Sequence, residues 1–231
     1  PQLLEGVCSI PGLSRVRFTT SHPKDIDPAL IAAFGRFENL CPSLHLPLQS
    51  GSNSVLKRMG RRYSVEAYLE IVRDLRRACP NIVLSTDLIV GFPGEDESDF
   101  RQTLVTMEEI GFDSSYSFKY SDRPGVKASG FPGKVDEQTK SRRLLELQTL
   151  QSDLTERSLQ GLVGQEVDVL VEGSSAMQNG QSPSWRGREP GGRVVNFSWA
   201  GRRDLTGTVV RVHINQAKKH SVTGEVKKSY G

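Results

Sequence analysis

Cysteine is scarce in this sequence, and its three cysteines, Cys8, Cys41 and Cys79, lie far apart. No two of them form a CxxC or CxxxCxxC spacing, so these residues predict neither a metal site nor a disulfide framework. Scattered thiols of this kind are typical of small buried side chains in a cytosolic protein.

The sequence also lacks an apolar run that approaches the roughly 20 residues of a membrane-spanning helix. No charged segment followed by an apolar segment resembles a signal peptide. We therefore expect a soluble protein of the cytoplasm.

The sequence has little excess of either charge, because its net charge is only +3, but the distribution of that charge is uneven. From Gly161 onward there are ten Lys or Arg against six Asp or Glu, whereas the first 160 residues hold twenty against twenty-one. This excess of four positive charges in the C-terminal part indicates that a polyanion binds there, although the same charges could also serve solubility alone.

The first 120 residues alternate between strand-like and helix-like segments, which favours βα units around a parallel sheet. We expect strands at 15–19, 44–48, 81–90 and 113–120. The expected helices cover 28–37, a segment from Val55, 64–78 with Ser64 as its N-cap, and a segment that ends at Gly111. Eight such units would need about 250 residues, so the sequence predicts a partial TIM-like α/β barrel.

The pattern changes after residue 120. Residues 121–134 are rich in Gly and Pro and predict a loop, and residues 135–162 predict a long helix. Beyond Gly164, short alternating segments at 166–172, 192–199, 205–214 and 220–226 predict a small all-β barrel. We therefore expect two domains, at 1–160 and 161–231.

Three polar residues are expected at or near strand ends of the α/β part: Gln49, Arg61 and Asp87. A guanidinium can bind an α-carboxylate through two hydrogen bonds, while a carboxylate and an amide suit ribose hydroxyls. An amino acid joined to a nucleoside, such as S-adenosylmethionine (SAM), would satisfy all three groups. For Gln49 alone, a solvated turn residue is the alternative.

Five segments of this sequence together resemble the radical-SAM tRNA methylthiotransferases, in the order in which that family has them. They are RFTTSHP, LHLPLQSGSNSVLKRMGRRYS, LSTDLIVGFPGEDESDF, DSSYSFKYSDRPG and VLVEG. The resemblance implies a radical-SAM barrel, an RNA-binding TRAM module of OB-like form at the C-terminal end, and methylthiolation of carbon 2 of a prenylated adenosine beside the tRNA anticodon.

The resemblance also implies roles for individual residues. Gln49, with its neighbour Ser50, would contact the ribose of SAM, Arg61 its methionine carboxylate, and Asp87 its ribose or neighbouring groups. The backbone of residues 118–121, beginning at Phe118, would lie beside the adenine.

The sequence departs from this family at the iron–sulfur ligands. The family's enzymes carry two [4Fe–4S] clusters, one of them on a CxxxCxxC loop, and this sequence has no such motif. We therefore expect the C-terminal portion of such an enzyme, unable by itself to cleave SAM reductively. A ribosomal-protein aspartate methylthiotransferase and a non-catalytic RNA-binding module remain alternatives.

Several other polar and aromatic residues have both a structural and a ligand-binding interpretation. His22 and His45 are expected near the same strand ends, where they would satisfy backbone groups or, as the alternative, bind a metal. Glu95 and Asp96 should begin a helix, with Glu95 as an alternative neighbour of the SAM amine. Of the three aromatic residues at period two, we expect at least two to pack in the core and one to stack on a ligand: Tyr116, Phe118 and Tyr120.

Cations and aromatic rings interleave in the C-terminal part, as in proteins that bind single-stranded RNA. We expect RNA contacts from Arg186, Arg188, Arg193 and Asn196, near Trp185 and Trp199. Phe197 is expected instead to fill the small barrel.

Overall fold

The computed structural model describes residues 1–19, 22–175, 184–199, 201 and 203–226. The chain divides into two compact units, Pro1–Leu154 and Thr155–Gly231. Within the described residues, none of the helices has the length and apolar character needed to cross a membrane.

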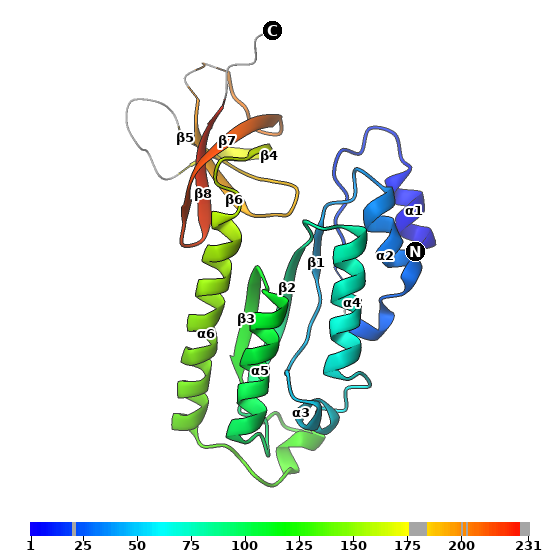
Figure 1. Cartoon of the computed structure of the whole chain (residues 1–231), viewed down its shortest axis with the longest axis vertical. Coiled ribbons are helices and arrows are strands. Elements are labelled where there is room, and N and C mark those ends of the chain that lie inside the picture. The colour runs from blue at the N-terminus through cyan, green and yellow to red at the C-terminus, as the bar shows by residue number, and fades with distance from the viewer. Residues whose placement is uncertain (20–21, 176–183, 200, 202, 227–231) are drawn as a thin grey trace. The chain divides into compact units, whose positions relative to one another are not determined.

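The first unit is built on a parallel sheet with the strand order β1-β2-β3 (Figure 1). The strands are β1 (Ser43–His45), β2 (Val83–Val90) and β3 (Ser114–Lys119). The helices are α1 (Gln2–Cys8), α2 (Pro28–Arg36), α3 (Asn53–Arg58), α4 (Val65–Ala78), α5 (Glu97–Ile110) and α6 (Glu137–Gln160), with short 3-10 turns η1 (Pro23–Asp25) and η2 (Lys127–Gly130). The last turns of α6, after Leu154, belong to the second unit. The predicted α/β architecture with a parallel sheet is confirmed.

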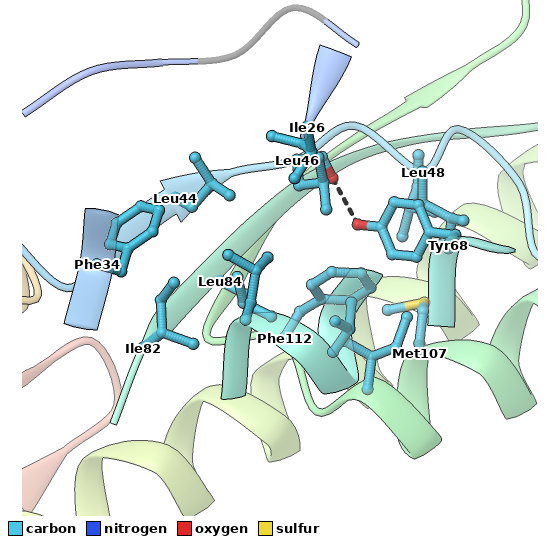
Figure 2. Packing of buried hydrophobic residues seen from close by; sticks show 14 of the residues in the cluster. Ile26, Phe34, Leu44, Leu46, Leu48, Tyr68, Ile82, Leu84, Met107 and Phe112 are labelled. Atoms are coloured by element: carbon cyan, nitrogen blue, oxygen red, sulfur yellow. Dashed lines mark hydrogen bonds between the residues drawn. The ribbon is translucent and has the colours of Figure 1, made fainter. Parts of the chain in front are cut away.

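One face of this sheet carries the core. Along β2, buried residues alternate with partly exposed ones, and the buried set packs against helical side chains such as Tyr68 and Met107 (Figure 2). The Tyr68 hydroxyl donates a hydrogen bond of 2.7 Å to the Leu46 carbonyl. The helical layer and the sheet are therefore joined by a polar contact inside an apolar cluster.

The opposite face of the sheet is partly open. It carries Asp87 and Ile89 on β2, whose register partners on β3 are Tyr116 and Phe118. These two aromatic side chains are 63% and 54% exposed, so the prediction that at least two of the three aromatic residues pack in the core is wrong. Only Tyr120 packs internally, with its ring centroid 5.0 Å from that of Phe92.

The helix boundaries follow local capping chemistry. The Ser64 hydroxyl accepts a hydrogen bond from the Ala67 amide, which confirms the predicted N-cap of α4. Asp96 and Asp99 form a reciprocal capping box at the start of α5, and Gly111 ends that helix with φ 62°.

Two predicted strands are shorter than expected. Within 15–19, only Val16 pairs, through a single bridge to Leu40, because no strand runs beside the rest of that segment among the described residues. β1 ends at His45 because Pro47 has no amide to donate and the Leu48 amide bonds the Thr86 hydroxyl instead.

The second unit is a closed barrel in the order β4-β5-β6-β8-β7. Its strands are β4 (Glu166–Ser174), β5 (Ser184–Arg188), β6 (Val194–Ser198), β7 (Val209–Lys218) and β8 (Ser221–Val226). Phe197 is buried in the barrel core together with valines such as Val195 and Val222, as predicted. The strand β5 was not expected from the sequence.

Candidate functional site: a cavity at the ends of the parallel strands

Gln49 lies where the chain leaves the sheet, in a conformation that is unusual for a residue with a side chain. Its φ is 69°, in the left-handed region, which costs on the order of 1–3 kcal/mol and persists only where the surroundings impose it. The surroundings here are two backbone hydrogen bonds to β2, from the Gln49 amide to Asp87 and from the Ile89 amide to Gln49. The backbone of Gln49 is therefore held in one place beside β2.

The loop that follows Gln49 is anchored from α5. The Gly51 amide donates to the Thr103 hydroxyl at 3.0 Å, and the Ser52 hydroxyl donates to Asp99 at 2.5 Å. The Ser50 hydroxyl lies 3.3 Å from that of Thr103 and is buried. Ser50 thus faces α5 and is not among the described residues that line the cavity, so it serves the loop rather than the open space.

An open cavity of about 980 Å³ lies at these strand ends and brings together Gln49, Arg61, Asp87 and Phe118. Four of the five residues predicted to contact the cofactor therefore share one cavity. Apolar side chains line it as well, namely Ile89, Phe92, Tyr120, Val126, Ala128 and Phe131. A cavity with aromatic and aliphatic walls, into which polar groups converge, is the usual form of a small-molecule site.

Arg61 lies three residues after the end of α3 and is half-buried. Within the described residues, no ion pair joins its guanidinium to a carboxylate. Burial lowers the pKa of the nearby His22, and the positive charge of Arg61 lowers it further. A half-buried guanidinium without a carboxylate partner is suited to an anionic ligand.

Asp87 lies within β2 and is the only carboxylate among the described residues that line the cavity. His45 approaches it, with Nε2 3.4 Å from Oδ1, while His45 Nδ1 lies 3.0 Å from the Ser85 hydroxyl. The two histidines predicted near the strand ends do not share one cavity: His22 lines the large cavity, whereas His45 lines a smaller one of about 490 Å³.

Glu95 does not begin α5, contrary to the sequence prediction, because Asp96 caps that helix. The Glu95 carboxylate is buried, accepts from the Gly91 amide, and pairs with Arg143 at 2.8 Å. Burial raises the pKa of the Glu95 carboxyl, and the bonds from Gly91 and Arg143 oppose that shift. This pair fastens the turn after β2 to α6.

The cation and amide groups predicted to contact RNA are partly engaged within the barrel. Arg188 Nε donates to Glu172 at 2.7 Å, and Arg186 Nε lies 3.7 Å from the same carboxylate. Asn196 accepts from the Ser175 hydroxyl at 3.0 Å. Arg186 is exposed, while Arg193 is half-buried.

Both tryptophans of this region, Trp185 and Trp199, pack against the barrel core. Their rings are therefore partly used for packing.

The residues of the cavity fit SAM but not an iron–sulfur cluster. Arg61 suits its carboxylate, Asp87 and Gln49 its hydroxyls, and the exposed Phe118 ring a nucleobase. Cys8 and Cys41 are buried and do not line the cavity, and no group of three metal-ligating side chains occurs in the described part of the chain. A [4Fe–4S] cluster needs thiolates that these residues do not supply.

Parts of this chain are similar to known protein families and to a solved structure. Residues 2–107 match the Radical SAM superfamily, and residues 160–227 match the TRAM domain. The structure resembles coproporphyrinogen III oxidase (HemN) from Escherichia coli, with a TM-score of 0.49 and 14% identity, over 73% of this chain and 45% of that one.

Curated relatives match nearly the whole chain and share one name, tRNA-2-methylthio-N(6)-dimethylallyladenosine synthase. The relative from Nitratidesulfovibrio vulgaris strain DP4 is 53% identical over 97% of this chain and 50% of its own length. That from Syntrophobacter fumaroxidans is 48% identical over 98% and 48%, and that from Moorella thermoacetica 43% over 97% and 49%. The chain spans about half the length of these relatives, and it belongs to the radical-SAM tRNA methylthiotransferase family.

Proposed function

We propose that this chain provides the SAM-binding and RNA-binding parts of an enzyme that methylthiolates carbon 2 of a prenylated adenosine beside a tRNA anticodon. The observation that carries the proposal is the convergence of Gln49, Arg61 and Asp87 on one cavity. The shared name of the relatives supports the choice of tRNA over a ribosomal protein as the substrate. With tRNA as substrate, the reaction would take place in the cytoplasm.

In this proposal each polar group of the cavity has one task toward SAM. Arg61 holds the methionine carboxylate, because a half-buried guanidinium without an internal partner binds an anion without first breaking another pair. Gln49 and Asp87 accept from the ribose hydroxyls, and the backbone that begins at Phe118 lies beside the adenine. SAM, when bound, supplies the methyl group and the radical chemistry of the family.

Positioning is the task of the surrounding backbone. The left-handed turn at Gln49 and the anchoring of Gly51 to Thr103 hold the amide against β2. A loop whose backbone is already ordered loses little conformational freedom when a ligand binds, which favours affinity.

The proposed enzyme needs two [4Fe–4S] clusters, for which this chain supplies no ligand set in its described residues. The chain alone is therefore proposed to bind SAM and RNA without cleaving SAM. The alternative, a non-catalytic RNA-binding module, predicts that the chain binds RNA but does not bind SAM.

The adjacent arginines Arg61 and Arg62 provide a matched test. Arg61 lines the cavity, whereas Arg62 is exposed and is not among its lining residues. Titration calorimetry with S-adenosylhomocysteine should show a loss of affinity of about tenfold or more for Arg61→Ala, which removes a charge-assisted contact. Arg62→Ala should bind as the unchanged chain does; equal binding by both variants, or no binding by the unchanged chain, would refute the cofactor assignment.

A further inference from the structure

The cavity carries more positive charge than SAM can use. Six Lys or Arg side chains line it, and Asp87 is the only carboxylate among its described lining residues: Lys57, Arg58, Arg61, Lys119, Arg123 and Lys127. SAM has one carboxylate, but its ammonium and sulfonium groups are both positive. A ligand that is itself cationic leaves most of these side chains without a counter-charge.

Two of the six cations already have internal partners. Lys119 pairs with Glu137 at 2.8 Å, and Arg58 lies 3.9 Å from Asp99. If Arg61 is assigned to SAM, the cations that remain are Lys57, Arg123 and Lys127, and no ion pair joins these three to a carboxylate within the described residues. All three are exposed.

These three cations come from separate parts of the first unit. Lys57 lies in the last turn of α3, Lys127 begins η2, and Arg123 lies in the loop before it. They nevertheless line one cavity, together with the exposed Phe118 ring. Cations that track phosphates beside an aromatic surface that stacks on a base are the elements by which proteins bind single-stranded nucleic acid.

We infer that Lys57, Arg123 and Lys127 form a phosphate-binding rim that holds the backbone of a single-stranded RNA segment at the mouth of the cavity. This inference rests on the proposed function and deepens it, because it gives the first unit its own RNA contacts beside those expected of the TRAM barrel. The rim binds a backbone and does not read sequence, since lysine and arginine contacts to phosphate carry no base information.

The rim can be tested by replacing its charges and comparing with a control of equal charge. The test variant is Lys57→Gln/Arg123→Gln/Lys127→Gln. The control is Arg36→Gln/Arg73→Gln/Arg77→Gln, which removes three exposed cations from α2 and α4 that do not line the cavity. The probe is a fluorescein-labelled RNA stem–loop with adenosines in its loop, titrated with the full chain at several salt concentrations by fluorescence anisotropy.

The rim predicts a change in both affinity and salt dependence. Each lost phosphate contact with a single strand lowers the slope of log K against log salt by about 0.7, so the test variant should lose about 2 units of slope. The control variant should keep most of the slope of log K against log salt that the unchanged chain shows. An equal loss in both variants, or an unchanged slope in the test variant, would overturn the inference.

Two further measurements distinguish the phosphate-binding rim from a small-anion site and from the proposed SAM site. Adenosine monophosphate or inorganic phosphate should compete poorly with the RNA, because a rim of dispersed cations binds several phosphates at once; efficient competition would instead indicate a small-anion site and overturn the rim. S-adenosylhomocysteine should bind the test variant as well as the unchanged chain. A rim variant that loses RNA but keeps S-adenosylhomocysteine supports the inference even if the chemistry of the proposed function proves wrong.

Discussion

The imidazole of His45 joins two side chains of β2: its Nε2 lies 3.4 Å from Asp87 Oδ1 and its Nδ1 lies 3.0 Å from the Ser85 hydroxyl. It also meets the Tyr116 ring edge to face, at a centroid distance of 5.9 Å. His45 does not line the large cavity, yet it lies beside Asp87, the one carboxylate among the described residues that line it. We therefore expect His45 to act as a positioning residue for Asp87.

We predict that His45→Ala weakens S-adenosylhomocysteine binding by about three- to tenfold, because Asp87 loses the group that orients it. In a double-mutant cycle with Asp87→Asn, the two effects should be non-additive by about 0.5–3 kcal/mol. Calorimetry measures both, and His220→Ala in the barrel unit is the control. Additive losses would show that His45 acts independently of Asp87.

Alkaline pH should destabilise the first unit through Tyr63. Its hydroxyl donates to the carbonyls of Pro47 and Leu48, and burial raises its pKa to about 12, against the opposing charge of Arg61. Because the folded-state pKa lies above the ordinary 10, neutral Tyr63 contributes stability that is fully present below pH 10 and is lost as pH rises through 12.

Tyr63→Phe should therefore cost about 0.5–1.5 kcal/mol near neutral pH and should flatten the alkaline decline in stability. Urea denaturation followed by circular dichroism, from neutral pH to about pH 11, checks this. Tyr116→Phe, on the open face of β3, is the control. A decline of the same steepness in Tyr63→Phe would assign the alkaline loss to another group.

Gly51 should not tolerate a side chain. A Cβ there would lie 2.5 Å from the Thr103 Cα, which is backbone and cannot move aside. Gly51→Ala should destabilise the chain by about 1–3 kcal/mol and weaken S-adenosylhomocysteine binding. The control is Gly6→Ala in α1, where a Cβ meets open space and φ is not unusual, so this change should be neutral or stabilising. Thermal melting measures both variants, and an equal decrease in their melting temperatures would contradict the close contact at Gly51.

Radical chemistry should be absent from the chain alone. After iron–sulfur reconstitution under reducing conditions, we expect no 5′-deoxyadenosine from SAM above the level without protein, because radical generation belongs to the cluster. Chromatography of the products checks this. Formation of 5′-deoxyadenosine would mean that residues of this chain ligate a cluster.

The barrel arginines should contribute RNA affinity beyond the rim. Replacing Arg186, Arg188 and Arg193 with alanine should weaken tRNA binding and lower the salt slope by roughly 0.7–0.9 per lost phosphate contact. Arg188 and Arg186 must first leave Glu172, so Glu172→Gln should strengthen binding modestly. Filter binding at several salt concentrations measures both, and unchanged affinity in the triple variant would remove these arginines from the RNA interface.

The convergence of Gln49, Arg61 and Asp87 could be predicted because the carboxyl ends of parallel strands meet at one edge of a sheet. The exposure of Tyr116 and Phe118 could not, since alternation identifies two faces of a strand without telling which one a helical layer covers. Similarly, the pairing of Glu95 with Arg143 joins positions 48 residues apart, which no local pattern contains. The strand β5 was missed because SWRGR, with Gly187 inside it, shows no apolar alternation.

The two units differ in how their sheets end. The barrel closes through β4 and β7, so its strand order leaves no unpaired edge, whereas the sheet of the first unit ends at β1 and β3 in the described residues. An unpaired strand edge can pair with a strand of another chain, which leads to aggregation. The two exposed aromatic rings on β3 increase this tendency. Aggregation of the isolated chain should therefore begin at β3, and a lysine in place of Phe118 would suppress it at the expense of the stacking surface.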